Sequence, residues 1–302
     1  MTRNIVERIS ISEQKVQVTV MLPDIHRRVV NAKYVLERAA KIQEESNEMS
    51  LSISLLLMHD AVELLMLAVL DHLQLAAKKR REFMDFWSDI KQAGHAEPPD
   101  FVPMESLNKL RVGLKHNGNL PHPQTVRDLL PRVLGFFENL LKAYCGLSYS
   151  DVSLIGLVAD QEVRSLLHDA QKKFSSGEKA EALTNLKIAL HKLEHLKGKH
   201  MSLLQAPGKP SLPSEVAKAG SGKYLDELHS FLRESALRMN TVMLGVDPAR
   251  YGSFVRNTPN VQWSVSGKPT VIHSSTYAAV SEPDFSEMIN FLIDYALKVS
   301  EA

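Results

Sequence analysis

The most apolar stretch of the chain is the feature that most constrains its fold. From Met49 to Ala77, hydrophobic residues occupy nearly every side of a predicted helix, which indicates a central element with other helices packed around it. The centre of this helix carries His59, Asp60 and Glu63. An acidic residue at the centre of a membrane-spanning helix costs about 2.5 to 3.5 kcal/mol on insertion scales. We therefore predict the buried helix of a bundle, with no membrane as a partner.

The sequence around this helix predicts a helical bundle over residues 23–146. After Pro23 the apolar residues recur at helical spacing, which predicts a first helix to about Glu45. A third helix is predicted over 81–91, and a fourth over Met104–His116, which Asn117-Gly118 would end. The apolar positions of a long last helix share one face: Val126, Leu130, Val133, Phe137, Leu140 and Tyr144.

The rest of the chain predicts further helices and little strand, so the fold class is mainly α. Residues 1–22 alternate in hydropathy and predict a β-hairpin or extension. A helical hairpin is predicted over 147–197, followed by a flexible linker rich in Gly, Pro, Ser and Lys over 198–222. Over 223–302 the pattern predicts a small α+β region with a helix, a β-hairpin and a closing amphipathic helix.

The charge balance and the cysteine count limit the compartment and the partners. The chain has 36 basic and 35 acidic residues, a net charge of +1, so no general basic bias toward nucleic acids exists. Cys145 is its single cysteine, which excludes an internal disulfide and a cysteine-based zinc cluster. The first residues lack the apolar core of a signal peptide. We therefore expect a cytoplasmic protein.

Two short motifs that could hold a metal or a cofactor are interpreted as structural. His191, Glu194 and His195 have the order of an inverted zinc-protease motif, but they are expected to form the solvated flank of a helix because no third ligand is evident. Gly220 to Lys223 lacks the first glycine and the final Ser or Thr of a phosphate-binding loop. We predict neither a metal nor a cofactor.

One motif points to a function. Arg111 and His116 are separated by four residues, in a predicted helix that precedes the last helix of the bundle. Together with the bundle layout and the second helix with its acidic centre, this motif resembles the HEPN superfamily over roughly residues 23–146. Val112, where catalytic members commonly have a polar residue, and Gly113 depart from the usual pattern. The resemblance implies a homodimer or larger oligomer, a catalytic cleft at the dimer interface, and metal-independent endoribonuclease activity, which this superfamily often uses in toxins and antiviral defence effectors.

The chemistry of the motif fits this activity. A histidine that titrates near neutrality can act as the acid or base, and an arginine can stabilise charge on the reacting phosphate, so His116 and Arg111 take these roles. The flanking RNA backbone would be held by further polar and basic residues: Lys115, Asn117, Lys78, Lys79, Arg80 and Arg81. His59, Asp60 and Glu63 are expected to support the same cleft, or to be buried polar groups that bind other helices.

A non-catalytic function remains as the alternative. His116 at a helix end is favoured there by the helix dipole, and Arg111 with Lys115 could belong to an ordinary solvated face. Five residues rotate an ideal helix by about 140°, so Arg111 and His116 share a face only if the helix loosens at Gly113. In this alternative the bundle is a dimerisation or partner-binding module. The candidate partners are therefore RNA, a partner protein and a second copy of the chain.

Overall fold

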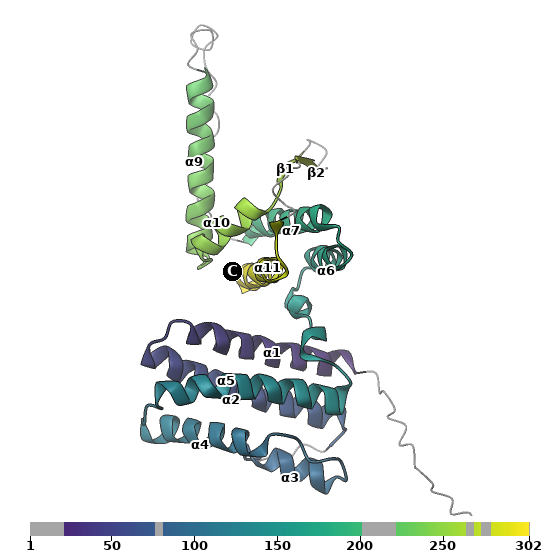
Figure 1. Cartoon of the computed structure of the whole chain (residues 1–302). Helices are drawn as coiled ribbons and strands as arrows, with labels where there is room; N and C mark the ends of the chain where they lie inside the picture. The colour runs from purple at the N-terminus through teal and green to yellow at the C-terminus, as the bar shows by residue number, and fades with distance from the viewer. Residues whose placement is uncertain (1–20, 76–80, 201–221, 264–268, 273–278, 302) are drawn as a thin grey trace, which may run out of the picture. The chain divides into compact units, whose positions relative to one another are not determined.

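The computed structural model describes residues 21–75, 81–200, 222–263, 269–272 and 279–301, and it is mainly α-helical, as predicted (Figure 1). The chain forms two compact units, Met1–Val152 and Ser153–Ala302. The predicted N-terminal β-hairpin and most of the predicted linker lie outside the described residues.

The described part of the first unit contains five α-helices, most of which run side by side in Figure 1. Their bounds are α1 Pro23–Gln43, α2 Glu48–His72, α3 Asp85–Gln92, α4 Phe101–Asn117 and α5 Pro123–Leu140, after which come the π-helical turn η1 Leu141–Cys145 and the 3-10 turn η2 Tyr149–Asp151. The central helix α2 packs against α1, α5 and α4. Its buried side chains cover more than half of its circumference, as the sequence predicts for a central helix, and Met49, Ile53 and Asp60 lie on the one exposed side.

The ends of these helices follow local rules that the sequence shows. Pro23 is the first residue of α1, a position that suits its fixed φ. The side chain of Asn47 caps α2 by accepting a hydrogen bond from the backbone N–H of Ser50 at 2.8 Å. Gly118 ends α4 as predicted, with a left-handed φ of 67°. The N–H of Gly118 bonds to the carbonyl of Leu114 at 3.1 Å, the bond of an αL cap, and the N–H of Asn119 bonds to the carbonyl of Gly113 at 3.1 Å.

The predicted end of the central helix was wrong. Helix α2 ends at His72 rather than near Ala77, because the chain turns at Gln74, whose φ is 56°. Lys78, Lys79 and Arg80, which follow the end of α2 in the sequence, lie outside the described residues.

The first unit ends after Val152, six residues beyond the predicted boundary at Gly146. The reason is a buried lysine on α1. Nζ of Lys33 donates to the carbonyls of Tyr149 (2.9 Å) and Val152 (2.7 Å), and it lies over the Tyr149 ring. These bonds hold η2 on the bundle. Burial lowers the pKa of Lys33, which Glu37 and Asp151 partly oppose.

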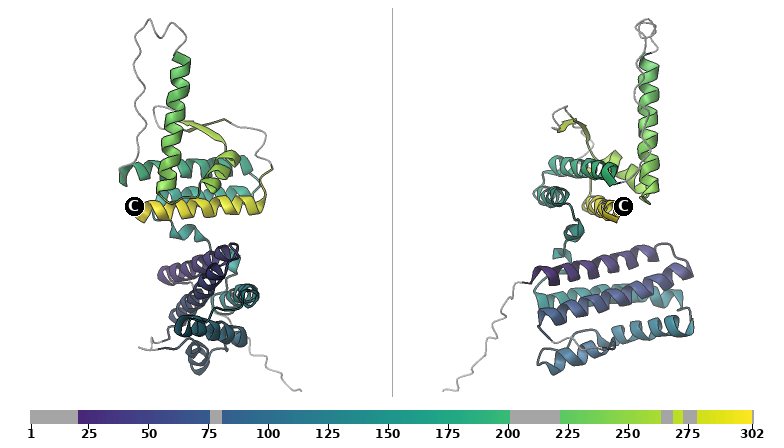
Figure 2. Two further views of the ribbon diagram at one scale, coloured as in Figure 1. Left: turned by 90° about the vertical axis from the view of Figure 1, so that its left-hand side faces the viewer. Right: turned by 180° about the vertical axis from the view of Figure 1, so that it is seen from behind.

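The second unit brings together segments that the sequence analysis assigned to two domains. Its elements are η3 Leu154–Leu157, α6 Gln161–Ser175, α7 Lys179–His200, α9 Gly222–Met243, α10 Pro248–Asn257, β1 Asn260–Trp263, β2 Pro269–Ile272 and α11 Glu282–Glu301. Helices α6 and α7 pack as a pair, and α11 packs on α7 (Figure 2). The rings of Phe174 and Phe285 stack 3.9 Å apart between α6 and α11. The predicted helical hairpin and C-terminal region thus share one core.

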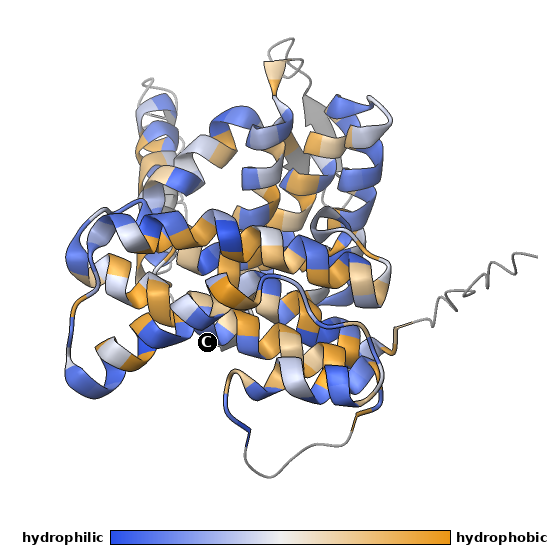
Figure 3. Cartoon of the chain, turned by 60° about the horizontal axis from the view of Figure 1, so that its bottom comes forward, coloured by the Kyte–Doolittle hydropathy of each residue, from blue (hydrophilic) through white to orange (hydrophobic). Residues whose placement is uncertain are grey.

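The two strands of the second unit pair antiparallel, with Asn260 opposite Ile272 and Trp263 opposite Pro269. The residues that connect them, 264–268, lie outside the described part. In Figure 3 most helices alternate between hydrophobic and hydrophilic positions, which is the pattern of elements with one buried side.

Candidate functional site

The predicted catalytic pair lies on α4, and the helix separates its two members. Helix α4 continues as an α-helix through Gly113, so Arg111 and His116 are rotated by about 140° from each other. His116 is exposed, whereas Arg111 is half-buried. Within one chain these two side chains therefore do not face one site. Arg111 instead shares a face of α4 with Asn108, three residues before it, and Lys115, four residues after it.

Arg111 lines a pocket of about 350 Å³ in the first unit. The pocket lies between α2 and α4, which pack against each other, and has both polar and apolar walls. Its lining residues are Met49, Ser52, Ile53, Leu56, Asp60, Arg111, Leu114, Lys115 and Leu120. Among the residues that the structure describes, Arg111 has no hydrogen bond and no ion pair. Its guanidinium is thus available to an anion that enters the pocket.

His59 stands next to this pocket in the core of the bundle. Its side chain is 2% exposed, its ring stacks on Phe83 with 4.2 Å between centroids, and Nε2 lies 3.2 Å from Oδ1 of Asn108. Burial lowers the pKa of His59 most, and the positive charge of Arg111 lowers it further. The hydrogen bond with Asn108 and the nearby carboxylates oppose this shift. The neutral imidazole is therefore favoured in the folded chain.

Asp60 and Glu63 lie beside His59 on the same turn of α2. Their side chains are 58% and 42% exposed, and their nearest oxygens are 3.6 and 4.0 Å from Nδ1 of His59. The structure thus brings the three predicted support residues together at the side of Arg111. Asn108, which links α4 to His59, was missed by the sequence analysis. The sequence signal for Asn108 was its position three residues before Arg111, which puts both side chains on one face of a helix.

The predicted RNA-binding residues fall into different environments. Lys115 lines the pocket, and Asn117 is exposed at the end of α4. Lys78, Lys79 and Arg80 lie outside the described residues.

Arg81 occupies a structural position rather than the predicted one. Its Nε donates to Oδ2 of Asp89 at 2.8 Å, and these side chains are only 9% and 7% exposed. The guanidinium also lies over the ring of Phe86. Because Arg81 is already paired and largely buried, we correct its assignment from RNA contact to a tether of the segment before α3.

Exposed apolar side chains surround the pocket. Met49, Ile53 and Leu120 are among its lining residues, with exposed fractions of 64%, 46% and 52%. Val112, next to Arg111 in the sequence, is 39% exposed. Apolar residues grouped around polar ones are typical of interaction sites.

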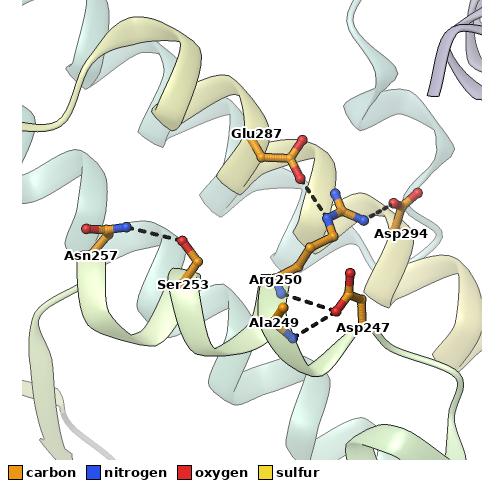
Figure 4. Close-up of polar contacts among 7 residues, drawn as sticks. All are labelled: Asp247, Ala249, Arg250, Ser253, Asn257, Glu287 and Asp294. Atoms are coloured by element: carbon orange, nitrogen blue, oxygen red, sulfur yellow. Dashed lines mark hydrogen bonds and ion pairs between the residues drawn. The ribbon is translucent and has the colours of Figure 1, made fainter. Parts of the chain in front are cut away.

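The second unit has its own polar cluster, which is built differently (Figure 4). Arg250 of α10 donates from Nε to Glu287 and from Nη1 to Asp294 of α11, both at 2.6 Å. Asp247 caps α10 by accepting from the N–H of Ala249 at 2.8 Å. Glu194 of the His191 motif accepts a hydrogen bond from the Tyr251 hydroxyl at 2.8 Å. The bonds of Arg250 and Tyr251 join α10 to α11 and α7, whereas the Asp247 bond caps α10 itself.

In the described part of the chain, α2 is the one helix long and apolar enough to cross a membrane by length and composition. Of its most apolar window, 61% is buried inside the structure, and the core helix of a soluble protein passes the same test. Comparisons of the chain with protein-family models, curated proteins and solved structures returned no match.

Proposed function

We propose that the helical bundle of residues 23–146 is a metal-independent endoribonuclease that acts as a homodimer in the cytoplasm, as its resemblance to the HEPN superfamily implies. The observation that carries this proposal is the placement of Arg111, a cation without an ion-pair partner in the described structure, in a pocket that Lys115 also lines. Two cations in a concave site favour a phosphate group as ligand.

In this proposal, Arg111 binds the scissile phosphate. A base removes the proton of the RNA 2′-hydroxyl, whose oxygen then attacks phosphorus. The bond to the 5′ oxygen breaks, and that oxygen receives a proton. His116 serves as the acid or base because it is exposed at the end of α4. Since His116 does not face the same way as Arg111 of its own chain, the active cleft would combine α4 helices of two copies.

The exposed apolar rim supports such a dimer. Met49, Ile53 and Leu120 line the pocket and would be covered when a second copy packs on this face. Because a two-fold interface repeats the same patch on both partners, two copies of α4 would approach each other there.

Two measurements on the purified full chain test the proposal. Single-stranded RNA should be cleaved in the presence of EDTA, leaving a 2′,3′-cyclic phosphate on the 5′ fragment. Light scattering at micromolar concentration should give a dimer or larger oligomer. A monomer that leaves RNA intact would contradict both parts of the proposal.

The apolar rim alone also favours the second candidate, a non-catalytic dimerisation or partner-binding module. Ile53→Glu should weaken self-association in either case, whereas Leu134→Glu on α5, an exposed apolar residue outside the pocket lining, is the matched control. Both variants should melt near the wild-type temperature. A dimer that Ile53→Glu disrupts, with no RNA cleavage by the wild-type chain, would favour the module over the nuclease.

A further inference from the structure

A buried nitrogen that lacks a partner in the described part of the chain lies 3.6 and 4.0 Å from the oxygens of two carboxylates. Among the described residues, Nδ1 of His59 has no hydrogen-bond partner, although its side chain is almost wholly buried. The other ring nitrogen, Nε2, lies 3.2 Å from Oδ1 of Asn108, an atom that can only accept. Nε2 therefore carries the proton in the neutral ring. Nδ1 is left with its lone pair.

The lone pair of Nδ1 is close to two further electron-rich atoms. Oδ1 of Asp60 and Oε2 of Glu63 are 3.6 and 4.0 Å from it, too far for hydrogen bonds. All three atoms lie within 4.8 Å of one another. Burial and the charge of Arg111 disfavour a proton on Nδ1, since both lower the pKa of His59. Three acceptors that converge without a donor from the described residues favour a cation between them.

We propose that His59, Asp60 and Glu63 bind a divalent first-row transition-metal ion of the zinc type, through Nδ1 and one oxygen of each carboxylate. Imidazole with carboxylate is a ligand set for zinc, cobalt and manganese, whereas magnesium and calcium prefer oxygen alone. Bonds of about 2.0 to 2.2 Å require the three ligand atoms to come closer together. The exposed carboxylates can make this movement, while the buried imidazole stays in place.

Asn108 has the role of the outer partner that metal-binding histidines usually have. By accepting the Nε2 proton it fixes the tautomer and the direction of Nδ1. The stacked Phe83 ring holds the plane of the imidazole. Asn108 lies within α4, and Phe83 lies just before α3. The fold therefore positions the imidazole of His59 before any ion binds.

The ion goes beyond the proposed nuclease function and does not depend on it. It takes no part in the proton transfers assigned to His116, and cleavage in EDTA tests those separately. Its effect would be electrostatic, because Asp60 lines the pocket that holds Arg111. Neutralising two carboxylates there should strengthen the attraction of the pocket for anions.

Zinc titration of the full chain, freed of metal by a chelator, tests the site. Calorimetry should show one Zn²⁺ bound per chain, and Co²⁺ should give the visible absorption of a low-symmetry site. Asp60→Asn and Glu63→Gln should each weaken zinc binding at least tenfold. Asp128→Asn, an exposed carboxylate of α5 outside the cluster, should leave it unchanged. These substitutions are chosen over His59→Ala because the affected side chains are half-exposed and a melting curve can verify folding.

The histidines of α7 provide the competing explanation. If zinc binding is lost in the double variant His191→Gln/His195→Gln and retained in the cluster variants, the ion belongs to α7 and the proposal is overturned. It is equally overturned if the wild-type chain binds no zinc at micromolar concentration. Nitrogen NMR of the wild-type imidazoles decides without any variant: zinc should shift Nδ1 of His59 and leave its Nε2 protonated, and an unchanged Nδ1 resonance would exclude the site.

Discussion

Two arginines in the two units have opposite environments. Arg250 donates to two carboxylates of α11 at 2.6 Å each, lies over the ring of Phe291, and is 18% exposed. Arg111 lines a pocket and has no ion pair in the described part of the chain. The same side chain is thus a tether between helices in one unit and an open cation in the other.

The different environments of Arg111 and Arg250 show how a functional arginine can be distinguished from a structural one. A guanidinium that already binds two carboxylates has little left to offer a phosphate, since its directed N–H groups are occupied. Arg81, paired with Asp89, belongs with Arg250 by this criterion. Arg111 has no such partner among the described residues, and its positive charge adds to burial, the larger cause, in lowering the pKa of His59.

The largest expected effect concerns activity at Arg111 and His116. If the nuclease proposal holds, Arg111→Ala and His116→Ala should each reduce RNA cleavage by about 100-fold or more, roughly 2.7 kcal/mol in activation free energy, as is typical of charge-stabilising and acid–base groups. Their melting temperatures should stay near the wild-type value. Lys109→Ala is the control on the same helix, because Lys109 pairs with Glu105 at the surface. If both variants cleaved RNA as fast as the wild type, Arg111 would have no role in catalysis.

The next effect is on stability at Arg250. Arg250→Ala removes two charged hydrogen bonds and leaves Asp294 largely buried without this partner, so the free energy of unfolding should fall by about 2 kcal/mol. RNA cleavage by the folded protein should not change. Arg256→Ala, exposed on the same helix, is the control for urea denaturation. An equal loss in both variants would mean that the two carboxylates do not make Arg250 a tether.

A smaller effect is expected at the start of α10. Asp247 caps this helix through the N–H of Ala249, so Asp247→Ala should cost about 1 kcal/mol of stability. Asp247→Asn keeps an acceptor oxygen and should lose less. Chemical denaturation of the two variants measures the difference, and equal losses would indicate that the cap contributes nothing through its hydrogen bonds.

The smallest effect is a pH dependence in the first unit. The folded-state pKa of His59 lies below 6.5, so the unfolded chain binds more protons than the folded chain just below that pH. The stability that His59 contributes is fully present above pH 6.5 and is lost as the pH falls toward its folded-state pKa. In metal-free protein, urea midpoints at pH 7.5 and 5.5 should therefore differ less in His59→Gln than in the wild type. The same pH dependence in both proteins would contradict a buried neutral imidazole.

Most of the helices of the first unit could be predicted because their signals are local. Pro23 begins a helix, Gly118 ends one, and the apolar spacing between them sets which sides are buried. The end of α2 was missed because no proline or glycine in residues 73–77 forbids a helix, whereas the chain turns at Gln74 with a φ of 56°. The extension of the first unit to Val152 depends on tertiary contacts, since Lys33 bonds to carbonyls more than a hundred residues away.

The site was predicted only in its parts. Arg111, Lys115 and the trio on α2 could be selected from residue type and spacing, and the structure brings them to one side of the bundle. The sequence could not show which of the cations has an ion-pair partner. Arg81 and Arg111 look equally available in the sequence, yet Arg81 has Asp89 and Arg111 has an open pocket.

By itself, the sequence determined that the chain is mainly helical, that the apolar stretch around Met58 is a core helix, and that Arg111 and His116 cannot share a face of an uninterrupted α-helix. These follow from propensity and from the fixed rotation per residue. The tertiary structure alone decided which polar groups meet. His59 and Asn108 are 49 residues apart, and Arg250 and Asp294 are 44 apart. Such pairs depend on how whole helices pack, because a side chain's neighbours across an interface are set by the position and rotation of both helices, which no local pattern encodes.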